Sequence, residues 1–237
     1  CCWCKKMNTS WLRVTAPFAA FRYFQAGVYR STSPVIPHSA AWGLILNLAG
    51  IDIRINADEA TTQIDPAAPK LKIAIGAVSY GERVTLFQQL HTYPVGASGK
   101  EFAHRAKGNK YWIAPVKREL LNGLDCMIAV QSEEPDLLKR IKLGIKGELN
   151  ESRYGLPFAG DNNLLFDDIQ VLDAPEPCYW YSPVNSDAVP VSNSCRLSVK
   201  IDRLDSSKSI SHLFAPGKQM LSEPPSTAWV WTPESPQ

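Results

Sequence analysis

The side chains best suited to binding a ligand lie in a glycine-rich stretch, residues 92–110, and in the residues just after it. Lysine and arginine neutralise phosphates and aromatic rings stack on unpaired bases, so this mixture is typical of a loop that holds a nucleic-acid backbone. A plain surface loop is the other interpretation, because glycine and lysine alone favour one. The side chains that we expect to contact RNA are Lys100, His104, Arg105, Lys107, Lys110, Tyr111, Trp112, Lys117 and Arg118.

A second group of candidate RNA-binding residues lies in a loop between an expected strand at residues 11–14 and an expected helix at residues 37–49. Prolines keep this loop extended, and the positive end of the following helix dipole attracts anions. We expect the group to hold RNA phosphates or bases; the alternative is that it only caps the helix. Its members are Arg22, Arg30, Ser31, Thr32 and His38.

Catalysis is the next possibility, since RNA cleavage needs only a base for the 2′-hydroxyl and an acid for the leaving oxygen. Of the four histidines, His91 and His104 flank or lie in the basic stretch, near Tyr93 and Lys107. The sequence contains no Walker-type phosphate loop, nucleophile elbow or zincin motif. We therefore expect binding rather than catalysis, and no cofactor.

Metal binding is not favoured by the cysteines or the aspartates. The cysteines within residues 1–4 could ligate a metal, but Cys126, Cys178 and Cys195 lie singly, without paired spacing. The aspartates of residues 161–168 lack the spacing of a calcium loop. We expect reduced thiols, carboxylates that cap turns, and no metal site.

Charge is distributed unevenly along the 237 residues. Residues 1–120 contain 15 Lys and Arg against 7 Asp and Glu, whereas residues 121–237 contain 10 against 16. The total of +2 therefore conceals a basic half and an acidic half. This asymmetry indicates a polyanion on one side of the molecule and a protein partner on the other.

No membrane or secretory segment is expected. The longest apolar run, near residues 40–51, is shorter than the roughly 20 residues that a membrane span needs. The start of the chain lacks the pattern of a signal peptide, so we expect a cytoplasmic protein with residues 1–6 as an extension before Met7.

Hydrophobic patterns predict the remaining elements. Strands at 71–78 and 84–91 should form a hairpin around a turn at 80–83, and strands at 111–121 and 124–130 should meet at an Asn-Gly turn. An amphipathic helix is expected at 135–146, with a connection at 52–69 and short strands at 178–181 and 195–201. In the tail, residues 224–237, Trp229 and Trp231 should either pack back on the domain or dock on a neighbour.

Three short runs give the chain a resemblance to a known family. Pro17-Phe18-Ala19-Ala20-Phe21, Arg30-Ser31-Thr32 and the run from Pro37 to Leu44 resemble the amino-terminal signature of the Cas-five family, the RAMP-type subunits of CRISPR Cascade complexes. The DevS-like branch of type I-B systems is the most similar. Residues 111–130 also resemble the family's central pair of strands. The resemblance implies an α+β fold: a ferredoxin-like split βαβ domain at 7–175 with a protruding basic β-hairpin at about 88–115, and a small β-rich extension at 176–237.

The resemblance also implies a function. Such a subunit caps the 5′ handle of the CRISPR RNA and contacts the Cas-seven-type backbone and Cas-eight-type large subunits, with target DNA near the PAM end. Some members cut precursor RNA, and an adjacent lysine–histidine pair is expected of them. No such pair occurs here, so we expect a non-catalytic subunit in antiviral defence or transposition, with a processing endoribonuclease as the alternative.

Overall fold

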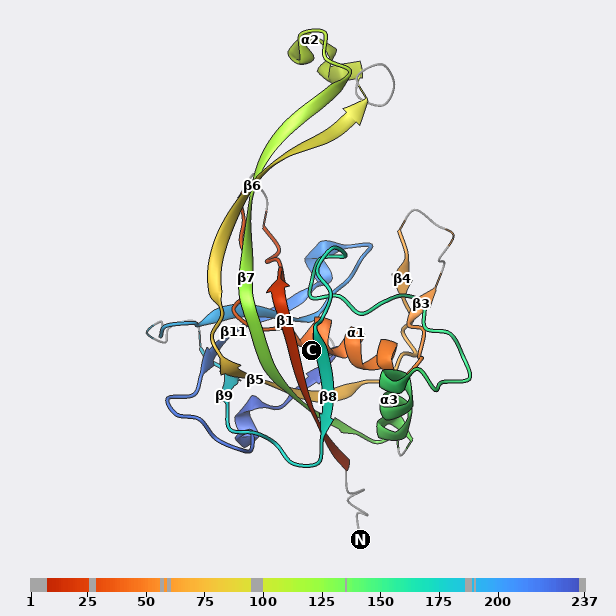
Figure 1. Cartoon of the computed structure of the whole chain (residues 1–237), viewed down its shortest axis with the longest axis vertical. Coiled ribbons are helices and arrows are strands. Elements are labelled where there is room, and N and C mark those ends of the chain that lie inside the picture. Colours follow the sequence, from red (N-terminus) through yellow and green to blue (C-terminus); the bar gives the residue numbers. More distant parts are fainter. Residues whose placement is uncertain are drawn as a thin grey trace.

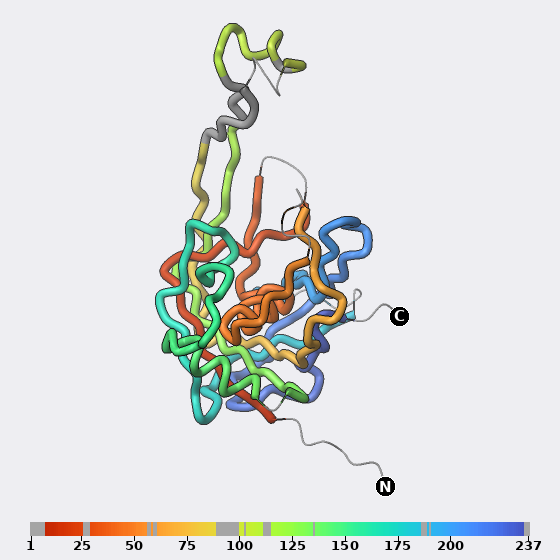
Figure 2. The backbone as a smooth tube through the Cα atoms, turned by 90° about the vertical axis from the view of Figure 1, so that its right-hand side faces the viewer, coloured from red at the N-terminus to blue at the C-terminus, as the bar shows by residue number. Residues whose placement is uncertain are grey.

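The computed structural model describes residues 8–25, 29–55, 58, 61–94, 100–134, 136–185, 189 and 191–234, with the backbone alone at 89–94, 102 and 111–114. In this part of the chain a ten-stranded, mostly antiparallel sheet forms the body, and two helices cover one of its faces (Figure 1). A two-stranded hairpin rises far out of the body (Figure 2). The expected α+β class is confirmed. None of the described helices is long and apolar enough to cross a membrane.

The strands and helices follow one another in a simple order. They are β1 (Asn8–Ala19), β2 (Tyr29–Arg30), α1 (His38–Leu48), β3 (Arg54–Ile55), β4 (Gln63–Ile64), β5 (Leu71–Ser79), β6 (Glu82–Pro94), η1 (Lys100–Phe102), α2 (Ala103–Ala106), β7 (Tyr111–Ser132), α3 (Leu137–Lys146), β8 (Asp168–Leu172), β9 (Tyr179–Pro183), β10 (Cys195–Lys200), η2 (Ser206–Lys208), β11 (Ile210–Pro216), η3 (Ser226–Ala228) and β12 (Val230–Thr232).

Four neighbouring strands, in the order β8-β1-β7-β5, form one end of the sheet, with β8 at its edge, and all three pairs are antiparallel. Helix α1 lies between β1 and β5 in the chain, and α3 lies between β7 and β8. Alternate residues of β1, such as Leu12 and Val14, are fully buried in the core that both helices share. The strand predicted at 11–14 and the helices predicted at 37–49 and 135–146 are confirmed, and β1 is longer at both ends.

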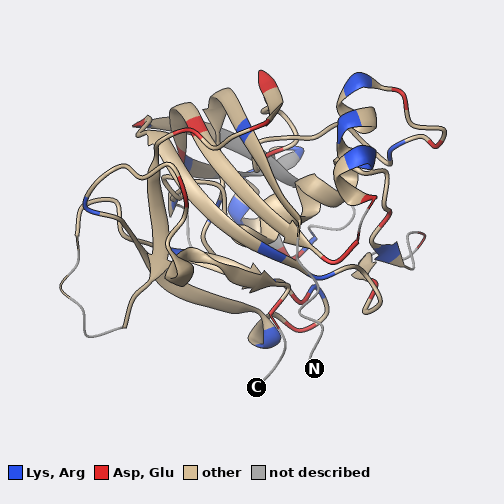
Figure 3. Ribbon diagram, turned by 90° about the horizontal axis from the view of Figure 1, so that it is seen from below, with Lys and Arg blue, Asp and Glu red and all other residues tan. Residues whose placement is uncertain are grey.

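The two helices meet at the end of α1. Gly50, with φ +67°, follows α1 and ends it as the sequence predicts. Arg140 of α3 donates from Nε to the Ala49 carbonyl at 2.7 Å, which satisfies a carbonyl at the negative end of the α1 dipole. The lysines of α3 lie on its outer, solvent-exposed face (Figure 3).

The predicted hairpin between residues 71–78 and 84–91 is wrong. Strands β5 and β6 both pair antiparallel with β7, so the chain continues along one edge of β7 instead of reversing. The backbone bends at Gly81, where a Cβ would lie 2.5 Å from the carbonyl oxygen of Asn122. Glycine is therefore required at this bend for close approach of the two backbones.

The predicted turn at Asn122-Gly123 is also wrong, because β7 runs through it as one strand of 22 residues. Gly123 takes a φ of +78°, which lets the strand bend without ending. The hairpin that does form pairs β6 with β7 from Glu82 opposite Asn122 to Pro94 opposite Tyr111. This hairpin includes residues 88–94 and 100–115 of the predicted hairpin, but its pairing begins at Glu82, closer to the body than the predicted start at about residue 88.

The C-terminal strands extend the same sheet, because β9 pairs with β5 and is followed by β11 and β10. The predicted strands at 178–181 and 195–201 are confirmed, and the described residues of the connection at 52–69 include the two-residue strands β3 and β4. On the sheet face opposite the helices, Trp229 packs with Trp180 and Met127. Trp229 thus packs back on the body, whereas Trp231 remains 42% exposed.

Candidate nucleic-acid interface

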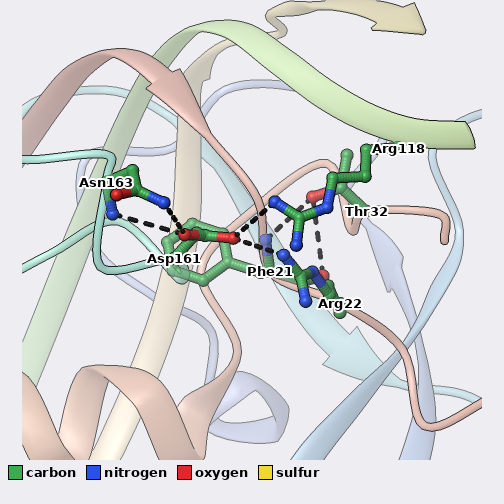
Figure 4. Close-up of polar contacts among 6 residues, drawn as sticks. All are labelled: Phe21, Arg22, Thr32, Arg118, Asp161 and Asn163. Atoms are coloured by element: carbon green, nitrogen blue, oxygen red, sulfur yellow. Dashed lines mark hydrogen bonds and ion pairs between the residues drawn. The ribbon is translucent and has the colours of Figure 1, made fainter. Parts of the chain in front are cut away.

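Two arginines share one aspartate at the root of the hairpin (Figure 4). Arg22 follows β1, Arg118 lies in β7, and Asp161 lies in the loop after α3. Arg22 Nη2 pairs with Asp161 Oδ2, and Arg118 Nη1 lies 3.4 Å from the same oxygen. Asn163 donates its backbone and side-chain N–H groups to Asp161 Oδ1, at 3.3 and 3.1 Å. Asp161 therefore caps its own turn, as predicted, and also holds both guanidinium groups.

A third guanidinium makes this group, the arginine cluster of Arg22, Arg30 and Arg118, strongly positive. Arg30 pairs with Arg118 where the short strand β2 runs beside β7, and it makes no ion pair among the described residues. Burial lowers the pKa of Arg22, and the charges of Arg118 and Arg30 lower it further, against the opposing effect of Asp161. Because arginine keeps its proton, the repulsion among the three guanidinium groups persists and is offset only in part by Asp161.

The cluster can still reach a ligand. The Arg22 and Arg118 side chains are 30% and 20% exposed, and Arg118 Nε is buried without a hydrogen-bond partner among the described residues. A phosphate can accept from guanidinium N–H groups of Arg22 and Arg118 that do not bond to Asp161, and such charge-assisted bonds are among the strongest hydrogen bonds in proteins. The arrangement is therefore suited to an anion with several oxygens.

Buried hydrogen bonds fix the loop that presents the cluster. Thr32 is fully buried; its Oγ1 accepts from the Phe21 backbone N–H at 2.9 Å. The Thr32 backbone N–H and the Tyr29 hydroxyl both donate to Glu119, at 2.8 and 3.2 Å. Thr32 thus positions the loop, whereas Ser31 is half-buried and faces its own loop.

The stem of the hairpin carries an aromatic ring beside a lysine. Phe87 and Lys117 are opposite each other in the β6–β7 register, and both are exposed, Phe87 by 58%. Directly opposite residues of an antiparallel pair lie on the same face, so the ring and the ammonium group share one surface. Such a surface can stack a base and neutralise its phosphate.

The tip of the hairpin is strongly basic. It contains η1 and α2, and α2 packs against β7 with Ala106 buried. From residue 100 to 118 the chain has six Lys and Arg and one acidic residue, Glu101. The exposed predicted residues here are Lys100, His104, Arg105, Lys107 and Lys110. Basic side chains therefore lie at two places on the hairpin: at its tip, and at Lys117, which is six residues after the start of β7 and so about 20 Å down the stem.

His38, predicted to contact RNA, is excluded from this interface by its burial. Its side chain is 0% exposed, neither ring nitrogen has a hydrogen-bond partner in the described part of the chain, and the ring stacks on Phe214 at 4.7 Å. Burial, with a smaller effect of His212, lowers the pKa of His38 to about 3. The expectation failed because β10 and β11 cover the start of α1.

Two other expectations fall outside the described structure. Tyr111 and Trp112 lie in β7 where the backbone alone is described, and the cysteines at residues 1–4 precede the described chain. The extension at 1–6 lies there too. Two features of the site were not predicted from the sequence. Phe87 is one apolar residue in an ordinary strand pattern, and Asp161 is far in the chain from the arginines that it binds.

The described side chains do not assemble a metal site or a histidine pair at the hairpin. His104 lies at the tip, while His212 is bonded to Glu234 at 2.5 Å in the C-terminal part. No group of three His, Cys, Asp or Glu among the described residues is placed to hold a metal. Cys126 and Cys195 are buried, and burial raises the pKa of each thiol to about 12.

The fold is shared with a chain of a solved complex, although no protein-family model and no curated protein sequence matches. The similar chain is described as a CRISPR RNA-guided surveillance complex; the TM-score is 0.56 at 16% identity, over 93% of this chain and 96% of that one. A structure described as a Cas protein has a TM-score of 0.46 at 12% identity, over 91% of this chain and 96% of that one. A CRISPR protein from Archaeoglobus fulgidus has a TM-score of 0.39 at 9% identity, over 94% of this chain and 91% of that one. Of these three structures, the first is similar enough to indicate a shared fold.

Proposed function

We propose that this chain is a non-catalytic RNA-binding subunit of a CRISPR surveillance complex, of the Cas-five type. The observation that carries the proposal is the basic surface of the hairpin, formed by the arginine cluster at its root and by the exposed lysines and Arg105 at its tip. Besides the three guanidinium groups, two of which share Asp161, the stem carries the exposed pair Phe87 and Lys117. Lysine and arginine bind phosphates without regard to sequence, and an exposed ring stacks on any base.

The fold supports the same proposal. The order β8-β1-β7-β5, with helices after the first and third of these strands in the chain, is the order of a ferredoxin-like split βαβ domain. The hairpin then emerges between the second and third strands of that domain. The solved chain with a TM-score of 0.56 belongs to an RNA-guided complex. Fold alone does not define function, so the basic surface carries the argument.

In this proposal the RNA is the 5′ handle of the CRISPR RNA. The arginine cluster holds handle phosphates, and the hairpin lies between the handle and the first Cas-seven-type backbone subunit. The body contacts the Cas-eight-type large subunit, near the PAM end of target DNA. As part of such a complex, the protein acts in the cytoplasm in defence or transposition.

Handle RNA should bind the purified protein with a steep salt dependence, because most contacts would release counterions from phosphates. With about five such contacts, affinity should fall by roughly 100-fold or more between 50 and 200 mM salt. Fluorescence anisotropy with labelled handle RNA measures this directly. An affinity that stays constant over this range would contradict the proposal.

Precursor RNA should remain intact when it is incubated with the protein, because the described histidines do not form an acid–base pair at the hairpin. Denaturing gel electrophoresis of a repeat-containing transcript checks this expectation. A discrete cut that His104→Ala abolishes would instead support the processing endoribonuclease.

A further inference from the structure

A loop beside the arginine cluster presents apolar side chains to solvent. Phe158 and Leu165 face each other across an isolated antiparallel bridge, and they are 46% and 50% exposed. Leu156, two residues before Phe158, is 69% exposed. We call Leu156, Phe158 and Leu165 the apolar patch. Their neighbours Ala159, Leu164 and Phe166 belong to or pack against the core.

Buried and exposed side chains alternate along this loop, and the nature of the exposed ones makes the patch unusual. Where one face of a paired segment is buried and the other solvated, the outward residues are normally polar. Here the inward residues and the outward residues are both apolar. Exposed apolar side chains gathered in one place mark an interaction site.

The loop is held firmly, so the patch is formed before a partner arrives. The Ala20 backbone N–H donates to the Ala159 carbonyl at 2.9 Å, and the Asp167 N–H donates to the Thr15 carbonyl at 2.8 Å. Gly160 has a φ of +86°, and a Cβ there would lie 2.4 Å from the Ala20 carbonyl oxygen. This close contact seats the loop on the end of β1, and preorganisation lowers the entropic cost of docking.

The charge around the patch determines what can cover it. Asp161, in the same loop, is already paired with Arg22 and Arg118, whereas Asp167 and Asp168 make no ion pair among the described residues. Asp167 and Asp168, just after the patch, are exposed. These two carboxylates attract a protein surface that is rimmed by lysine and arginine.

We propose that the apolar patch docks a partner protein whose contact surface is apolar at its centre and basic at its rim. Two chemically different surfaces thus meet at Asp161: the arginine cluster, which takes RNA, and the patch, which takes protein. The inference rests on the patch itself and stands whether or not the basic surface binds RNA.

A photoreactive benzoylphenylalanine in place of Phe158, in the full chain expressed in its organism of origin, identifies the partner. We expect one cross-linked protein, whose attached peptide has apolar residues flanked by Lys or Arg. Titration of that purified protein should show at least a tenfold loss of affinity for the variant Leu156→Ser/Phe158→Ser/Leu165→Ser. Asp167→Lys/Asp168→Lys should weaken binding several-fold.

The control variant Val191→Ser/Leu204→Ser removes two other exposed apolar side chains, 54% and 65% exposed, and should bind the partner normally. Handle-RNA affinity should be the same for the patch variant and the unmodified protein, which separates this test from that of the RNA-binding proposal. A cross-link to nucleic acid, to a second copy of the chain or to nothing would overturn the inference. Equal partner affinity of the patch and control variants would also overturn it.

Discussion

Arg118→Ala should weaken the binding of handle RNA by about 10- to 100-fold, since a charge-assisted hydrogen bond to phosphate contributes about 1.5–3 kcal/mol. Arg118 lies at the centre of the arginine cluster, between Arg30 across the β2–β7 pair and Arg22 at Asp161. Its loss removes one phosphate contact, so the slope of log affinity against log salt should also fall by about one. Anisotropy titrations at several salt concentrations measure both quantities.

Arg13→Ala is the matched control for this prediction. Arg13 is also a partly exposed, ion-paired arginine, 2.7 Å from Asp125 and 2.9 Å from Glu176. It lies on β1 about 20 Å from the end of that strand, where the arginine cluster begins. Arg13→Ala loses two ion pairs and Arg118→Ala loses one, so Arg13→Ala should lose at least as much thermal stability, yet it should bind RNA normally. Equal RNA affinity in the two variants would show that the cluster does not hold phosphate.

The sequence alone predicts the local elements of this fold well. Helix α1 follows from apolar residues at helical spacing and from Gly50, which supplies the positive φ that ends the helix. Helix α3 follows in the same way, with Leu137 and Ile141 buried. These signals depend on neighbours a few residues away, so tertiary contacts do not alter them.

The strand pairing predicted from the sequence was wrong in two places. Asn122-Gly123 is a strong hairpin signal, yet β7 continues through it because β1 pairs along one edge and β5 and β6 pair in succession along the other. Those pairings join residues far apart in the chain and override a local turn preference. The same cause explains Gly81, where the expected reversal is only a bend.

For the candidate site, too, local features were predicted from the sequence and contacts between distant residues were not. Basic and aromatic composition indicates the hairpin and Arg118, but Asp161 is separated from Arg22 by 139 residues, so no local pattern reveals their pairing. His38 fails for a related reason: a histidine after a proline at a helix start looks exposed, and only the remote Phe214 buries it.

Gly144→Ala should reduce the free energy of unfolding by about 3 kcal/mol, because the new methyl group meets backbone rather than a movable side chain. Gly144 lies in α3 against the end of α1, and a Cβ there would be 1.7 Å from the Leu48 carbonyl oxygen and 2.8 Å from its carbon. The two helices must therefore separate, which opens the core around Ile141. For a chain of this size the melting temperature should fall by roughly 6–12 °C.

Gly43→Ala, the matched control, makes the same chemical change in the other helix. Nothing lies within 4 Å of a Cβ at Gly43 in α1, so only helix propensity changes, and the variant should gain about 0.5–1 kcal/mol. Opposite shifts of the two melting curves are expected, measured by circular dichroism under one set of conditions. A Gly144→Ala protein as stable as the unmodified chain would mean that α1 and α3 do not pack as closely as the backbone of Gly144 and Leu48 requires.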